Sequence, residues 1–154
     1  MKNLVTLRFM LVSLFAIMSM AVSAGIIEYS TDDGFTYRLD TKAKTAELAE
    51  NKGSATEVSI SESVTYDCVV YSVTSLGGRC FWNCSSLTSI NIPSSVTSLG
   101  KYCFYNCSSL TSINIPSSVT SLGEWCFYYC SFLTSINIPS SVTSLGGECF
   151  SNCI

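Results

Sequence analysis

The sequence predicts a solenoid, a stack of repeats in which each repeat contacts only its neighbours. The stretch SSLTSINIPSSVTSLGKYCFYNC, residues 85–107, is followed by two further copies at residues 108–130 and 131–153. The period is 23 residues, and the first two copies agree at 20 of 23 positions. A fixed period between about 20 and 50 residues is typical of stacked-repeat folds. Such chains mostly present a surface and rarely perform chemistry, so this fold class already limits the function.

Each regular repeat is expected to form one rung of the stack. In the first copy, residues 87–92 predict a short strand with its apolar side chains inward, and Pro93 ends it because proline cannot donate to a ladder. We expect Gly100 to permit a sharp corner. Residues 101–107 are predicted to form one or two helical turns. The result is a right-handed stack, α/β to mainly β, with a parallel sheet on one face and short helical turns on the other.

The residues before the regular repeats differ in kind. Residues 34–49 predict two strands around the polar stretch Asp40–Lys44, a hairpin that would cover the first rung. We therefore assign residues 25–55 to an N-terminal capping hairpin. Repeats are predicted over residues 56–154, with a truncated last repeat and an irregular first one that carries a nine-residue insertion, roughly residues 65–73.

Residues 1–24 have the pattern of a secretory signal peptide. Lys2 and Arg8 precede an apolar run, and the small residues Ser23 and Ala24 end the segment. A transmembrane anchor is the alternative, but the run of about 14 residues is too short to span roughly 30 Å of hydrocarbon. We expect cleavage after Ala24, no membrane insertion of the mature chain, and a secreted or cell-surface location.

The composition excludes several function classes. Without Lys2 and Arg8 the chain carries 6 basic and 11 acidic residues, which argues against nucleic acid as a partner because phosphate binding needs clustered lysine and arginine. The chain has no histidine, no paired carboxylates within the regular repeats and no glycine-rich phosphate loop. The sequence therefore predicts no enzyme, no catalytic residue and no cofactor.

The regular repeats share the pattern L-x-x-I-x-I-P-x-x-V-x-x-L-G-x-x-C-F-x-x-C. Over about residues 56–154, this pattern resembles the BspA-like leucine-rich repeat, named for a bacterial surface antigen. The resemblance implies a leucine-rich-repeat solenoid on a secreted or surface protein, in a family associated with adhesion to host matrix or other cells. The family usually has alanine at one position where this chain has Cys80, Cys103, Cys126 and Cys149.

Eight of the nine cysteines recur with the repeat, as four C-x3-C pairs. Metal binding and disulfides are the functional interpretations, since secreted chains rich in cysteine often form disulfide frameworks. However, equivalent cysteines one rung apart would have parallel Cβ vectors about 4.8 Å apart, wider than a relaxed disulfide. Inward cysteines also behave as small hydrophobic residues. We predict buried free thiols and no metal site.

Two surfaces are candidate binding sites. The turn face would gather outward aromatic side chains, with Arg79 at one edge and Glu148 at the other. This face is a candidate because large exposed aromatic patches often mark interaction sites. Its candidates are Trp82, Tyr102, Tyr105, Trp125, Tyr128 and Tyr129. The sheet face is polar and regular, and its candidates are Thr88, Asn91, Thr111, Asn114, Thr134 and Asn137. The alternatives are rings that only pack on one another and a solvated sheet.

The sequence thus predicts a binding or adhesion module for an extracellular protein or glycan. The alternative is a structural or vestigial fragment of a longer repeat-containing surface protein. The strand of the last repeat, residues 133–138, has no neighbour after it within this sequence, and an unpaired strand edge is a template for another chain. We therefore also expect end-to-end self-association of the chain as it stands.

Overall fold

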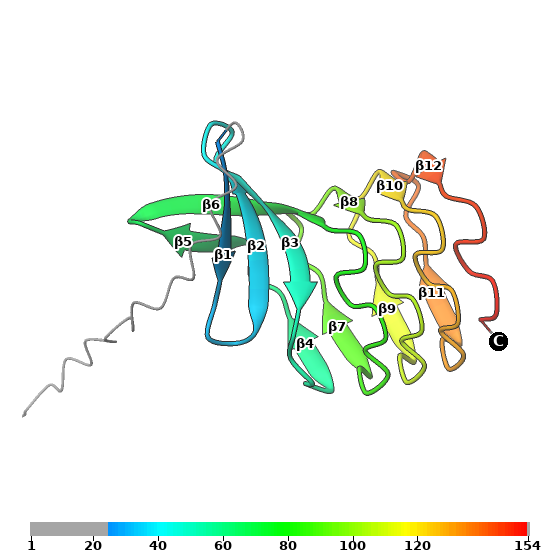
Figure 1. The fold of residues 1–154 in the computed structure, drawn as a ribbon. Coiled ribbons are helices and arrows are strands. Elements are labelled where there is room, and N and C mark those ends of the chain that lie inside the picture. The colour runs from blue at the N-terminus through cyan, green and yellow to red at the C-terminus, as the bar shows by residue number, and fades with distance from the viewer. Residues whose placement is uncertain (1–24, 154) are drawn as a thin grey trace, which may run out of the picture.

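The computed structural model describes residues 25–153, which form twelve strands and no helix. The expected cleavage site after Ala24 lies at the edge of the residues that are not described. Figure 1 shows a lead-in of strands followed by rungs that repeat along one axis. The lead-in strands are β1 (Ile26–Ser30), β2 (Phe35–Asp40), β3 (Thr45–Asn51), β4 (Glu57–Ser59), β5 (Ser63–Tyr66) and β6 (Val69–Leu76).

Every regular rung contributes two short strands to two separate ladders (Figure 1). The first ladder follows β7 (Ser89–Asn91), β9 (Ser112–Asn114) and β11 (Ser135–Asn137). Within it β9 pairs with β11 and β7 pairs with β4, whereas β7 and β9 are in contact without strand pairing. The second is formed by β8 (Ser98–Leu99), β10 (Ser121–Leu122) and β12 (Ser144–Leu145). The paired strands of these rungs are parallel and in the same repeat register, as in Ile113 with Ile136 and Leu99 with Leu122. The stack of repeats predicted from the period is thus confirmed.

The first ladder is shorter than predicted. We expected a strand over residues 87–92, and the structure has strand geometry only at Ser89–Asn91. The predicted facing is nevertheless correct, because Leu87, Ile90 and Ile92 are buried while Asn91 is exposed. The second ladder, β8 to β12, was not predicted as strands, because a two-residue segment is too short for an alternating pattern.

The lead-in continues the second ladder and covers its first rung. The predicted hairpin is present as β2 and β3, which pair antiparallel, and β1 adds a third strand that was not predicted. β3 then pairs in parallel with β6, and β6 pairs with β8. Leu39 and Leu48 are fully buried, and the Phe35 ring centre lies 6.5 Å from that of Phe81 in the first rung.

The insertion in the first repeat folds into a hairpin of its own. β5 and β6 pair antiparallel, and the turn between them places Asp67 and Cys68 at φ 48° and 59°. Positive φ at both central residues is the geometry of a two-residue turn that matches strand twist. Tyr66 of β5 meets Tyr29 of β1, with ring centres 5.1 Å apart. The insertion is therefore packed against β1.

The helical turns predicted for residues 101–107 are wrong. Tyr102 and Asn106 have φ of 59° and 56°, which a right-handed helix does not allow. The N–H groups instead alternate between two partners. Cys103 donates to the Gly100 carbonyl within its own rung, at 3.2 Å, whereas Phe104 donates to Cys126 O of the next rung, at 2.8 Å. The segment is a run of tight turns held by the adjacent rung, and the i→i−4 bonds of a helix are absent there.

Gly100 is required for a different reason from the one predicted. Its φ is not positive, since Gly25 and Gly34 are the glycines with positive φ among the described residues. A Cβ atom at Gly100 would lie 2.5 Å from the Gly78 nitrogen of the preceding rung. Gly123 and Gly146 are equally crowded by their preceding rungs. Glycine therefore permits close approach of neighbouring rungs rather than an unusual backbone angle.

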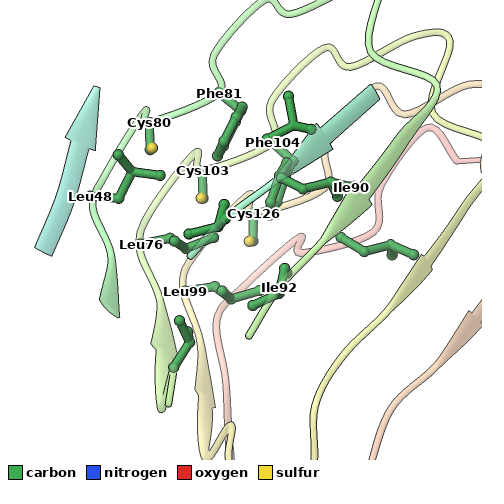
Figure 2. Close-up of a cluster of buried hydrophobic side chains, with 14 of the residues drawn as sticks. Leu48, Leu76, Cys80, Phe81, Ile90, Ile92, Leu99, Cys103, Phe104 and Cys126 are labelled. Carbon is green, nitrogen blue, oxygen red and sulfur yellow. The ribbon is translucent and has the colours of Figure 1, made fainter. Parts of the chain in front are cut away.

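The core is a set of columns, each filled by one repeat position. Phe81, Phe104, Phe127 and Phe150 stack with ring centres 5.2–5.4 Å apart and planes within 10° of parallel. Figure 2 shows the leucine column of Leu48, Leu76 and Leu99 beside the sulfur column of Cys80, Cys103 and Cys126. Columns of this kind bury each side chain between two copies of itself, so stability accumulates with the number of rungs.

We predict that Phe104→Ala lowers the free energy of unfolding by roughly 3–5 kcal/mol, because it empties the middle of a fully buried column. Cys103→Ala is the matched control in the same rung, and it should cost about 1 kcal/mol because it removes one small apolar group. Urea unfolding followed by circular dichroism measures both. Equal losses for the two variants would contradict the column as the source of stability.

In the last described rung, apolar side chains are exposed whose equivalents in earlier rungs are buried. Ile115 is 3% exposed, whereas its equivalent Ile138 is 41% exposed. Leu122 is 2% exposed, whereas Leu145 is 56% exposed. These side chains and the edges of β11 and β12 form a surface that fits another rung.

We predict that a purified polypeptide of residues 25–154 self-associates through this surface at micromolar concentration, because in that polypeptide the surface combines strand edges with exposed apolar groups. Sedimentation velocity should show dimers or larger species, and Leu145→Glu should shift the distribution to monomer. A stable wild-type monomer under the same conditions would contradict this expectation.

Candidate functional site

The turn face holds a pocket of about 330 Å³. It spans four successive rungs and is walled mostly by aromatic side chains, with a basic and an acidic residue among them. Its lining residues are Arg79, Trp82, Tyr102, Tyr105, Trp125, Tyr128 and Glu148. The structure thus brings together five of the six aromatic candidates. The sixth, Tyr129, lies beside the pocket with its ring edge toward Tyr128, at 4.7 Å between ring centres.

Two repeat positions form the walls of this pocket. The first position is Arg79, Tyr102, Trp125 and Glu148 in successive rungs, and all four residues have φ between 52° and 65°. The second position is Trp82, Tyr105 and Tyr128, three residues further along each rung. The left-handed backbone at the first position, together with the hydrogen bonds to the next rung, fixes where these side chains leave the turn. The pocket is therefore a direct product of the period.

The rings also pack on one another, as the alternative interpretation expected. Tyr105 and Tyr128 are stacked, with ring centres 5.3 Å apart and planes 8° from parallel. Tyr102 and Trp125 approach to 4.8 Å. Trp82 remains 51% exposed at the edge of the group. Packing and binding are compatible here, because the stacked rings form a rigid wall and leave one side open.

Charges are arranged around the aromatic wall. The Arg79 guanidinium carbon lies 5.4 Å from the centre of the Tyr102 ring. Lys101 Nζ lies 5.1 Å from the Tyr102 ring and 5.0 Å from the Trp125 ring, and it forms an ion pair of 2.6 Å with Glu124. The hydrogen bond to Glu124 raises the pKa of Lys101. Sequence reasoning missed Lys101, although its position directly before Tyr102 in the repeat was a visible signal.

The indole N–H of Trp125 is buried and has no hydrogen-bond acceptor among the described residues. Buried donors are almost always satisfied in proteins, and an unsatisfied one costs about 1–3 kcal/mol. This unsatisfied donor belongs to a residue that lines the pocket. The indole nitrogen itself is buried, so it is not open to the pocket.

The sheet face holds fewer free polar groups than its sequence suggests. Thr88 Oγ1 donates to Thr56 O at 2.9 Å, and Thr134 Oγ1 donates to Thr111 O at 3.4 Å. Asn91 Nδ2 donates to Ser59 Oγ at 3.4 Å. These side chains bridge neighbouring rungs. The remaining candidates Thr111, Asn114 and Asn137 are exposed on the same face. The sheet face is mainly a hydrogen-bonded ladder.

Residues 25–153 include no helix that is long and apolar enough to cross a membrane. Within the same residues, no group of three or more histidine, cysteine, aspartate or glutamate side chains is placed to hold a metal ion.

Residues 52–154 match the family model of the BspA type leucine rich repeat region, in six copies. The chain belongs to this family. No curated protein matches the chain. The fold is similar to that of a leucine rich cell surface protein from Faecalibacterium prausnitzii A2-165, with a TM-score of 0.74 and 35% identity over 82% of this chain and 34% of that one.

A leucine-rich repeat protein from Bacteroides ovatus ATCC 8483 is similar to the same degree, with a TM-score of 0.74 and 37% identity over 80% of this chain and 33% of that one. The leucine rich repeat protein of T. pallidum, at 21% identity and a TM-score of 0.63, shares the fold. The chain spans about a third of the length of the first two proteins. These comparisons establish the family and the architecture.

The repeat cysteines lie mostly in the core of the stack. All nine are free thiols, and six of the eight repeat cysteines are buried, with Cys84 and Cys153 half-buried. In the other cysteine position of the repeat, Cys107 Sγ donates to Phe81 O of the preceding rung at 3.2 Å, and Cys130 Sγ donates to Phe104 O at 3.2 Å. The thiols therefore act as small apolar side chains that also satisfy a carbonyl of the neighbouring rung.

Burial keeps these thiols neutral. Desolvation raises the pKa of Cys103 and Cys107, and it raises the pKa of Cys130 to about 12. Because thiolate is the reactive form of cysteine, the raised pKa makes these positions unreactive near neutral pH. Cys68, in the turn between β5 and β6, is exposed.

We predict that thiol labelling of native protein at pH 8 modifies Cys68 quickly and the buried cysteines slowly, with complete labelling after denaturation. A disulfide between Cys103 and Cys126, detected by mass spectrometry, would contradict the prediction.

The raised pKa of Cys130 in the folded state also predicts a pH dependence of stability. The free energy of unfolding should be fully present at neutral pH and fall as pH rises from about 8.5 toward 12, because the thiol ionises first in the unfolded chain. Cys130→Ala should flatten this decline by up to about 1.4 kcal/mol per pH unit.

Proposed function

We propose that this chain is a secreted or cell-surface binding module that uses the aromatic pocket of its turn face to hold an extracellular protein or glycan. The observation that carries the proposal is the convergence of five aromatic side chains from three successive rungs into one pocket. Membership of the BspA type leucine rich repeat family supports a binding or adhesion role. The signal-peptide pattern of residues 1–24 supports export.

The chemistry of the pocket favours binding over catalysis. Its titratable groups are Arg79 and Glu148 at the first and last of the four rungs, with tyrosines between them. A nucleophile beside a general base is not among the lining residues, and such a pair is the usual requirement for covalent catalysis. We therefore propose that the module has no catalytic activity.

The alternative role, a structural fragment of a longer surface protein, has one observation in its favour. The last described rung exposes Ile138 and Leu145, and this chain covers only about a third of each of the two similar solved proteins. In that role the rungs would act as a spacer, and the aromatic pocket would make no contribution to binding. The two roles therefore differ in what they expect of Trp82.

We predict that single serine substitutions at Trp82, Tyr105, Trp125 and Tyr128 reduce binding to an array of matrix proteins and glycans, with Trp82→Ser reducing it at least tenfold. Buried or partly buried aromatic side chains are the commonest source of binding energy at interfaces, whereas threonine rarely is. The matched controls are serine substitutions at Thr88, Thr111 and Thr134, which should leave the array signal unchanged.

Trp82 gives the clearest test of the site, because its half-exposed side chain can be replaced without leaving a cavity in the core. Circular dichroism and the unfolding midpoint of each variant should match the wild-type protein. Binding that survives Trp82→Ser and Tyr105→Ser but falls with the threonine substitutions would move the site to the sheet face.

A further inference from the structure

We propose that the turn-face pocket binds an extended, proline-rich peptide that carries an acidic residue at one end and a basic residue at the other. This inference rests on the proposed binding function and names its ligand class. Three observations point to it: the charges at the two ends of the pocket, the spacing between them, and the stacking of the rings.

The pocket is charged at both ends and aromatic in the middle. One repeat position supplies Arg79 in the first rung, Tyr102 and Trp125 in the next two, and Glu148 in the fourth. Three steps of about 4.8 Å separate the first rung from the fourth, or roughly 14 Å. A polyproline helix advances about 3.1 Å per residue, so four or five residues cover this distance. A short peptide with opposite charges at its ends therefore matches both charged residues at once.

The stacking of the rings disfavours a glycan. A sugar ring binds aromatic side chains by lying flat on an open ring face. One face of Tyr105 is stacked against Tyr128 at 5.3 Å, and Trp82 packs on Tyr105 from the preceding rung with ring centres 6.4 Å apart. Ring edges are therefore what the middle of the pocket offers. Proline-rich segments dock in grooves that are lined by aromatic side chains.

A charge swap tests the inference. The mixed-charge peptide acetyl-Glu-Pro-Pro-Pro-Pro-Lys-amide and the dibasic peptide acetyl-Lys-Pro-Pro-Pro-Pro-Lys-amide are titrated against purified exported protein, with tryptophan fluorescence as the readout. Wild-type protein should bind the dibasic peptide roughly threefold to tenfold more weakly, since one lysine then faces Arg79. In Arg79→Glu the order should reverse. Glutamate is compatible with this backbone, because Glu148 occupies the same repeat position at φ 52°.

Three results would overturn the inference: no saturable binding of the mixed-charge peptide, an unchanged order of the two peptides in Arg79→Glu, or Trp82-dependent binding of cellohexaose in place of either peptide. Trp82→Ser should abolish binding of both peptides. Peptide failure together with array binding that still depends on Trp82 would reject this ligand class and leave the proposed function standing. Loss of both would reject the binding function itself.

Discussion

The backbone hydrogen bonds between neighbouring rungs are the constraint on which the rest of this structure depends. On the turn face, every second N–H group points to a carbonyl of the following rung, as Phe104 does to Cys126. At the second ladder the direction reverses, and Gly100 donates to Leu76 of the preceding rung. A rung therefore completes its hydrogen bonding only when it has a neighbour on each side. A single 23-residue repeat has too few apolar side chains to offset this deficit.

The short distance between rungs that these bonds impose explains both the glycine that recurs in each repeat and the pocket. Glycine is required at Gly100 because the preceding rung occupies the space of a side chain. The same closeness stacks equivalent side chains, which gives the phenylalanine column inside and the aromatic wall outside. The two sets differ in their depth, since Phe104 is fully buried whereas Trp82 is half-exposed. One geometry thus produces the core and the candidate site.

Much of the fold follows from the period, the inward pattern and the proline, all of which repeat in the sequence. The register of the strands, the burial of Leu87 and the grouping of Trp82 with Tyr105 could be predicted for that reason. The conformation of residues 101–107 could not, because these turns are stabilised by carbonyls of another rung and not by local propensity. Lys101 was missed since its role comes from rings in two different rungs. The hydrogen bond from Thr88 to Thr56 O could not be predicted either, because its acceptor lies in another rung.

The near-identity of the regular repeats has a consequence for folding. Residues 85–107 and 108–130 present almost the same surface, so an unfolded rung can pair equally well with more than one neighbour, displaced by 23 residues. The hairpin of β5 and β6 has no counterpart in the later repeats, and Tyr66 anchors it to β1. This unique element breaks the degeneracy at one end of the chain. Assembly that starts from this hairpin and proceeds rung by rung toward the C-terminus would avoid such misaligned pairings.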